Sequence, residues 1–109
     1  MELKQLHTKY DLIAYAQTRI GGRSENQDSY GAADTTFGFL ATVCDGMGGG
    51  PSGKLASTIA VKTIIEYISN QSPEEISTKE VLEKAILSAN EAIITYGEEH
   101  PESYCLQHC

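Results

Sequence analysis

The spacing of apolar residues changes about halfway along the chain, from a period of two to a period of about 3.6. In residues 11–18 (DLIAYAQT) apolar side chains fall on both faces of an extended segment, which is typical of a strand covered on two sides. Residues 28–33 give a weaker strand pattern, and residues 34–36 favour a hairpin turn into a compact apolar strand at 37–45. The pattern therefore predicts an antiparallel β meander at the start of the chain.

Two amphipathic helices are predicted after the glycine run that ends at Gly53. The first should end near Asn70. Ser77 and Glu80 have the spacing of a capping box, so the second should begin there, with Gly97 as its C-terminal stop. The predicted helical core consists of Leu55, Ala56, Ile59, Ala60, Ile64, Tyr67 and Ile68 in the first helix, and Val81, Leu82, Ala85, Ile86, Ala89, Ile93 and Tyr96 in the second.

The order of these elements predicts a single α+β domain, in which a β meander precedes two antiparallel helices. A chain of 109 residues with 40% hydrophobic residues has room for one modest core. We expect a flexible leader at 1–10, the domain at 11–100 and an irregular tail at 101–109.

The net charge of −7 disfavours a nucleic-acid or anionic-membrane partner that would bind through a basic surface. It does not exclude phosphate chemistry, because a metal ion or a single arginine can supply local positive charge. We expect a cytoplasmic protein, since the sequence contains no membrane-length apolar run and no secretory signal pattern. Cys44 is predicted to be a buried, inert thiol, and the role of Cys105, His108 and Cys109 is left open by their sequence.

The glycine-rich segment that follows Asp45 has two interpretations. Residues 48–55 (GGGPSGKL) match a phosphate-binding nucleotide loop except at the last place, where Leu55 lacks the hydroxyl that would hold magnesium. Alternatively, the strand delivers the Asp45 carboxylate to a loop whose glycines allow close backbone approach to a ligand. The missing hydroxyl makes the nucleotide-loop interpretation the weaker of the two.

A second loop supplies residues that complement Asp45. Arg23 offers a planar fork to phosphate oxygens, while the carboxylates of Asp28 and Asp45 and the carbonyl of Gly46 are oxygen ligands that hard divalent cations prefer. The alternatives are a surface salt bridge for Arg23 and caps of local backbone groups for the two aspartates. Together these residues predict metal-assisted attack on a phosphoester.

The two segments that carry these residues, RSENQDS at 23–29 and FLATVCDGMGGGPSGKLAS at 39–57, resemble the metal-dependent type 2C serine/threonine protein phosphatases, particularly the bacterial ones. The resemblance covers roughly residues 11–100. It implies a four-layer αββα fold, with two antiparallel sheets between helix pairs and a binuclear manganese or magnesium site at one end. This chain would then form a partial αββα sandwich, the N-terminal half of that fold.

The resemblance also implies a role for each candidate residue. Asp45 would bridge the two metal ions, the Gly46 carbonyl would complete one of them, and Asp28 would be a ligand directly or through water. Arg23 would bind the phosphate of a phosphoserine or phosphothreonine protein substrate. A metal-activated water would attack phosphorus in line, without a covalent phosphoenzyme.

The chain departs from the family pattern in composition and in length. Gln27 stands where many relatives carry glutamate, Gly50 where a histidine is usual, and Lys54 where an acidic residue is usual. Family members are considerably longer, with further aspartates and strands, and the ending SYCLQHC resembles that of a truncated product. We therefore expect little or no activity from this chain alone. An inactive remnant that serves as a binding module is the alternative, and self-association through the unpartnered sheet is a further expectation.

Overall fold

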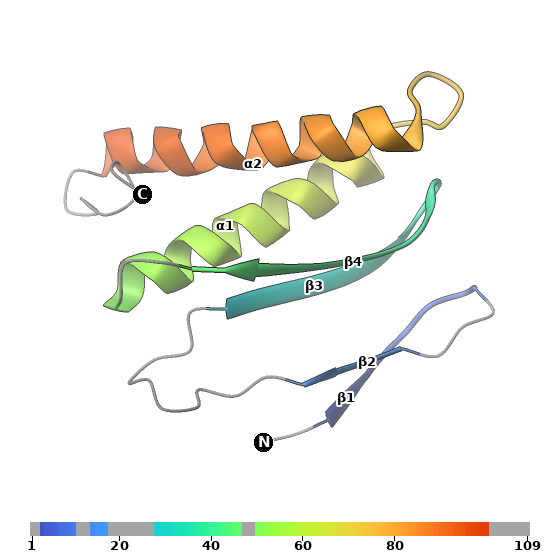
Figure 1. The fold of residues 1–109 in the computed structure, drawn as a ribbon, viewed down its shortest axis with the longest axis horizontal. Helices are drawn as coiled ribbons and strands as arrows, with labels where there is room; N and C mark the ends of the chain where they lie inside the picture. The colour runs from blue at the N-terminus through green and yellow to red at the C-terminus, as the bar shows by residue number, and fades with distance from the viewer. Residues whose placement is uncertain (1–2, 11–13, 18–27, 47–49, 101–109) are drawn as a thin grey trace.

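The computed structural model describes residues 3–10, 14–17, 28–46 and 50–100. Its architecture is α+β, as the sequence predicts, with two hairpins followed by two helices (Figure 1). The elements are β1 (Leu3–Leu6), β2 (Ala14–Gln17), β3 (Asp28–Thr35), β4 (Gly38–Asp45), α1 (Gly50–Ser69) and α2 (Thr78–Glu99).

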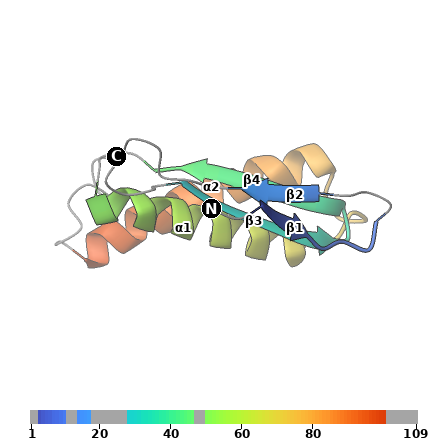
Figure 2. The same ribbon diagram turned by 90° about the horizontal axis from the view of Figure 1, so that it is seen from below.

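The strands form two separate antiparallel hairpins. β1 pairs with β2, with Leu3 opposite Gln17, and β3 pairs with β4 along the whole length of both strands. Each sheet has two strands within the described residues, so the predicted meander takes the form of two hairpins. Figures 1 and 2 place β1 and β2 on the side of the β3–β4 hairpin that lies away from α1.

β1 lies in the segment that the sequence predicts to be a flexible leader. It is held by its pairing with β2 and by hydrogen bonds from the following loop to the β3–β4 hairpin. The Thr8 hydroxyl and the Lys9 amide donate to the Asp34 carboxylate, and the Tyr10 hydroxyl donates to the Thr35 carbonyl at 2.8 Å. These partners are about 25 residues away in sequence, which is why the local polar pattern of the leader gave no sign of them.

The turn between β3 and β4 comes later than predicted, because β3 continues through Thr35. The Thr35 hydroxyl organises the turn: it accepts a hydrogen bond from the Phe37 amide at 3.0 Å and donates to the Gly38 carbonyl at 2.8 Å. Gly38 has φ 123°, a conformation that side-chain-bearing residues rarely adopt. The Thr36 hydroxyl donates to the Gln71 carbonyl at 3.1 Å and so ties the turn to the segment between the helices.

The helix α1 packs between the β3–β4 hairpin and α2 and provides the centre of the core (Figure 1). β3 approaches α1 closely at Gly31, where a Cβ atom would lie 2.7 Å from Val61 Cγ1. The central buried cluster joins both helices and contains Ile64, Ile68, Val81, Ala85 and Ala89, with Phe37, Leu40, Cys44, Ala60, Tyr67 and Ile76 packed against it.

The helix boundaries confirm two of the three predicted signals. α1 ends at Ser69, next to the predicted Asn70. Ser77 caps α2, with its hydroxyl accepting from the Glu80 amide at 3.1 Å. Neither α1 nor α2, the two helices that the structure describes, has the length and apolar character needed to cross a membrane.

The prediction that α2 stops at Gly97 was wrong. The helix continues to Glu99, and Gly97 is buried inside it. A glycine ends a helix when it adopts a positive φ, and among the described residues only Gly38 does so. The His100 amide instead donates to the Tyr96 carbonyl at 3.0 Å, and the two rings stack with their centroids 3.9 Å apart.

Candidate metal and phosphate site

The structure brings two of the predicted site residues together at one end of the β3–β4 hairpin. Asp28 is the first residue of β3 and Asp45 the last of β4, and the two are register partners. Side chains directly opposite each other in an antiparallel pair lie on the same face, with Cβ atoms about 4.5–5.5 Å apart. Both residues are exposed. Two carboxylates therefore share one solvent-accessible site at the end of the hairpin.

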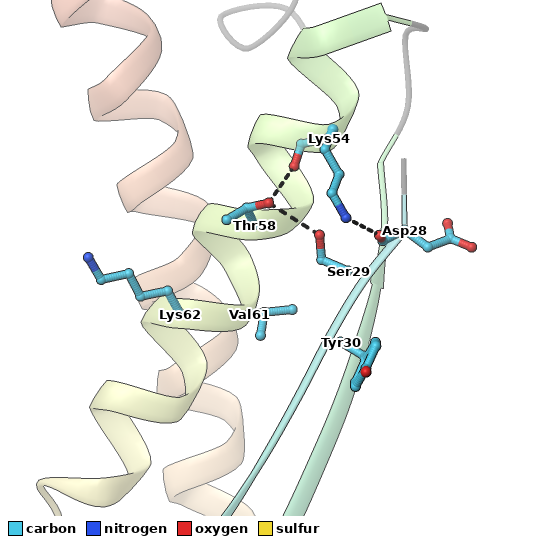
Figure 3. A pocket seen from close by; sticks show the side chains of 7 residues that line it. All are labelled: Asp28, Ser29, Tyr30, Lys54, Thr58, Val61 and Lys62. Carbon is cyan, nitrogen blue, oxygen red and sulfur yellow. Dashed lines mark hydrogen bonds between the residues drawn. The ribbon is translucent and has the colours of Figure 1, made fainter. Parts of the chain in front are cut away.

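The two carboxylates lie on the face of the hairpin that is turned away from α1. The next pair along the strands, Ser29 and Cys44, faces the helices: Ser29 is buried, and Cys44 packs against the core. Because side chains alternate along a strand, Asp28 and Asp45 must project from the opposite face. Figure 3 shows the Asp28 carboxylate pointing away from α1. We call this the outer face of the β3–β4 hairpin.

Other predicted residues are placed less completely. Gly46 directly follows Asp45 and is buried. Arg23 and Gln27 lie outside the described residues, so phosphate binding by Arg23 stays a prediction. No group of three or more His, Cys, Asp or Glu side chains suited to a metal ion occurs among the residues that the structure describes. The described donors are thus two carboxylates, with the Gly46 carbonyl as a candidate third.

A hollow of about 370 Å³ lies beside this site, between β3 and the N-terminal half of α1 (Figure 3). Its wall includes Lys54, whose ammonium group donates a hydrogen bond of 2.6 Å to the backbone carbonyl of Asp28. The residues that line the hollow are Asp28, Ser29, Tyr30, Lys54, Thr58, Val61 and Lys62. The side chain of Lys54 therefore connects α1 directly to the residue that carries one of the two carboxylates.

Hydroxyl groups, those of Ser29 and Ser57 buried, make a second connection between the same two elements. The Ser29 hydroxyl lies 2.7 Å from the Ser57 hydroxyl and 3.3 Å from the Thr58 hydroxyl. Both α1 hydroxyls also donate to the Lys54 carbonyl, at 3.0 and 2.8 Å respectively. Ser57 is only 2% exposed, so this network lies in the packed interface and fixes the spacing of the two elements.

Sequence reasoning assigned no role to Lys54, Ser29 or Ser57. Lys54 falls on the polar stripe of the first predicted helix, where a lysine is usually solvated. Both serines lie within the two segments that carry the family resemblance. Their small hydroxyl side chains were the one feature of the sequence that could have indicated a hydrogen bond between these segments. Cys44 is half-buried against the core, whereas Cys105 and His108 lie outside the described residues.

Comparison with known proteins decides the family. The sequence model described as "Protein phosphatase 2C" matches residues 17–106. The chain belongs to the protein phosphatase 2C family. A Mycoplasma genitalium protein named "Putative protein phosphatase" is 34% identical over 70 residues, which are 62% of this chain. No solved structure matches the chain.

The same match spans 27% of the length of the Mycoplasma protein. The matched range contains both described carboxylates, Asp28 and Asp45, and also Arg23. The site argued from the hairpin geometry thus lies within the part of the chain that carries the family signal.

Proposed function

We propose that this chain provides part of the active site of a manganese- or magnesium-dependent phosphatase acting on phosphoserine and phosphothreonine proteins. The observation that supports this most directly is the pairing of Asp28 with Asp45 at one end and on one face of a hairpin. The family membership gives the reaction class, and the paired carboxylates suggest where its metal ion is held.

The chemistry of these donors fits a hard divalent cation. Manganese and magnesium prefer oxygen ligands, and carboxylates are the strongest oxygen donors that a protein offers. Two carboxylates directly opposite each other on a sheet repel, and a shared cation relieves that repulsion. In this proposal Asp28 and Asp45 hold the ion, and Gly46 contributes its carbonyl.

A bound ion of this kind supplies polarisation of a phosphate oxygen and a lower pKa for its water ligand. The chain supplies the rest of the proposed site. Asp45, at the end of β4, fixes the ion next to the glycine-rich segment, and Arg23 binds the substrate phosphate through its planar guanidinium. The substrate proposed on family grounds is a phosphoprotein with a phosphorylated serine or threonine.

The donor set also limits what the chain is expected to do alone. Two carboxylates and one carbonyl leave several positions of an octahedral ion to water, which should make binding weak. We therefore expect little or no phosphatase activity from the 109-residue chain. The second candidate function is a binding module without catalysis, which the small number of described carboxylate donors favours.

A calorimetric titration of the chain with Mn²⁺ tests the metal site. We expect measurable binding that Asp45→Asn weakens at least about tenfold and Asp28→Asn also weakens, because each change removes a charged ligand. The matched control is Glu83→Gln, which removes one exposed carboxylate from α2 and should leave the affinity unchanged. Equal Mn²⁺ affinity in the wild type and both aspartate variants would contradict the proposed site.

Hydrolysis of an aryl phosphate and of a phosphothreonine peptide, with and without Mn²⁺, tests the activity. If the chain binds Mn²⁺ through Asp45 but hydrolyses neither substrate, the result would support a partial site or a binding module. Mn²⁺-dependent turnover that disappears in Asp45→Asn would show instead that the chain, alone or self-associated, completes a working site.

A further inference from the structure

We propose that Lys54 is a positioning residue, whose ammonium group anchors the start of β3 to α1 and thereby holds the Asp28 carboxylate opposite Asp45. This inference rests on the proposed metal site, because it assigns the contact that keeps two of its ligands in register. Lys54 itself would contact neither the metal ion nor the substrate.

The side chain of Lys54 makes the anchoring contact. Lys54 Nζ lies 2.6 Å from the Asp28 carbonyl oxygen, a short distance typical of a charge-assisted hydrogen bond. Within the described residues Lys54 forms no salt bridge; the ion pair found there joins Lys84 to Glu80. The ammonium group thus acts on Asp28 through its backbone rather than by neutralising a carboxylate.

The backbone of Lys54 takes part in the hydrogen-bond network between α1 and β3. Its carbonyl accepts hydrogen bonds from the Ser57 and Thr58 hydroxyls, and both of these hydroxyls also contact Ser29. Two consecutive residues of β3, Asp28 and Ser29, are therefore both fastened to one turn of α1. Figure 3 shows the Lys54 and Thr58 side chains reaching across from α1 to this point.

The contacts of Ser29 with α1 also set the direction of the Asp28 side chain. Successive side chains of a strand point to opposite faces, so a strand whose Ser29 side chain is fixed toward α1 must turn its Asp28 side chain to the outer face. The terminal pair of a strand ladder opens more readily than the central pairs. The hydrogen bond to the Asp28 carbonyl holds this last pair of the ladder in place and keeps the carboxylate beside that of Asp45.

The electrostatic effect of Lys54 has the opposite sign, which makes the proposal testable. A lysine near a cation site repels the cation, so removing its charge should by itself strengthen Mn²⁺ binding. Loss of an anchor should weaken binding, because the ligands are then no longer held in place. A variant that loses a positive charge and still binds Mn²⁺ more weakly must have lost a positioning contact.

The matched control is Lys62, two turns further along α1. It lines the same hollow, is exposed, and has the same side chain and charge, but the described structure gives it no hydrogen bond to β3. Lys54→Met and Lys62→Met therefore remove the same charge and differ in the anchor. Lys54→Arg keeps both the charge and the donor and serves as the rescue variant.

The test measures Mn²⁺ affinity by calorimetry and backbone amide exchange by NMR in the 109-residue chain. We expect Lys54→Met to bind Mn²⁺ about tenfold more weakly, the lower end of the range for outer-sphere partners of metal ligands. Lys62→Met should bind equally or more tightly, and Lys54→Arg should resemble the wild type. In the exchange measurement, Lys54→Met should accelerate amides near Asp28 and Asp45 without affecting those near Thr35 and Gly38.

The two readouts separate failure of this inference from failure of the proposed function. If the wild-type chain binds no Mn²⁺, the metal site is wrong, and the exchange pattern alone decides whether Lys54 anchors β3. Identical behaviour of Lys54→Met and Lys62→Met in both readouts would overturn the inference. If Lys54→Met unfolds, Lys54→Ala replaces it, since alanine lacks the donor and is the best helix former. Fast exchange confined to the Asp28–Asp45 end would support the anchor, and wild-type exchange there would refute it.

Discussion

Asp28 and Asp45 face each other as the terminal pair of the β3–β4 ladder, so two like charges share one end of a small sheet. Like charges directly opposite each other on a sheet destabilise it. We therefore expect Asp45→Asn to raise the thermal melting temperature of the metal-free chain by a few degrees. A ligand that binds only the folded state stabilises it, so Mn²⁺ should raise the melting temperature of the wild type but not of Asp45→Asn.

Thermal melts with and without Mn²⁺ measure both effects, with Glu83→Gln as the control for simple loss of a negative charge. The prediction requires opposite effects of one substitution: more stability without the metal and less response to it. An Asp45→Asn chain that melts lower than the wild type in the absence of metal would assign Asp45 a structural role instead.

The close approach of β3 to α1 at Gly31 leads to a packing prediction. A Cβ atom at this position would lie 2.6 Å from Ile65 Cδ1 and 2.7 Å from Val61 Cγ1. The terminal methyl of Ile65 can move, but the stiff Val61 side chain cannot yield without shifting α1. We expect Gly31→Ala to lower the free energy of unfolding by about 1–3 kcal/mol, as overpacking of a core usually does.

Urea unfolding of Gly31→Ala, Val61→Ala and the double variant measures this effect as a mutant cycle. Val61→Ala makes room for the new methyl group, so the double variant should be less destabilised than the sum of the single ones. Simple additivity would mean that Gly31 is needed for a reason other than its contact with Val61.

The parts of the fold that the sequence predicted are those fixed by local patterns. The helical period and the Ser77 cap predicted α2 because each depends only on residues a few positions apart in the sequence. The prediction at Gly97 failed because a glycine permits a helix to end but does not require it. Here the helix continues, and Gly97 is buried within it. β1 was missed because its stabilising partners, β2 and Asp34, are distant in sequence.

In the candidate site, too, residue types could be predicted from the sequence, whereas contacts between distant segments could not. Asp28 and Asp45 were predicted as metal ligands from their residue type, and the hairpin pairs them, although their register cannot be read from the sequence. Lys54 was placed on the polar face of the first helix and noted as a departure from a family pattern, with no role assigned to it. Its proposed positioning role depends on which carbonyl its long side chain reaches, and that depends on how α1 packs on β3.

The contact of Asp34 with the β1–β2 loop predicts a pH dependence. The pKa of Asp34 lies below its ordinary value of 3.8, chiefly because the Thr8 hydroxyl donates to its carboxylate; the Lys9 amide and charge act in the same direction, and desolvation opposes them. A carboxyl group with a lowered pKa in the folded state stabilises the fold above its unfolded pKa. That contribution is lost as the pH falls from about 3.8 through the lower folded value.

Carboxyl NMR titration measures the pKa of Asp34, and urea unfolding between pH 6 and pH 3 measures its consequence. We expect the stability difference between the wild type and Asp34→Asn to shrink as the pH falls. Thr8→Val removes the main cause and should raise the pKa of Asp34 toward its ordinary value. A titration of Asp34 at or above that value in the wild type would contradict the hydrogen-bonded arrangement.

The outer face of the β3–β4 hairpin also predicts self-association. Val43 lies on this face, next to the Asp28–Asp45 pair, and is 75% exposed, which is unusual for a large apolar side chain in a strand. We expect the average mass in sedimentation to rise with protein concentration, and Val43→Glu to shift the chain toward monomer by placing a charge on this face. Ile86→Glu is the matched control, because Ile86 is 61% exposed but lies on α2. A wild-type chain that stays monomeric at every concentration would refute the prediction, and an equal effect of both variants would mean that association does not use this face.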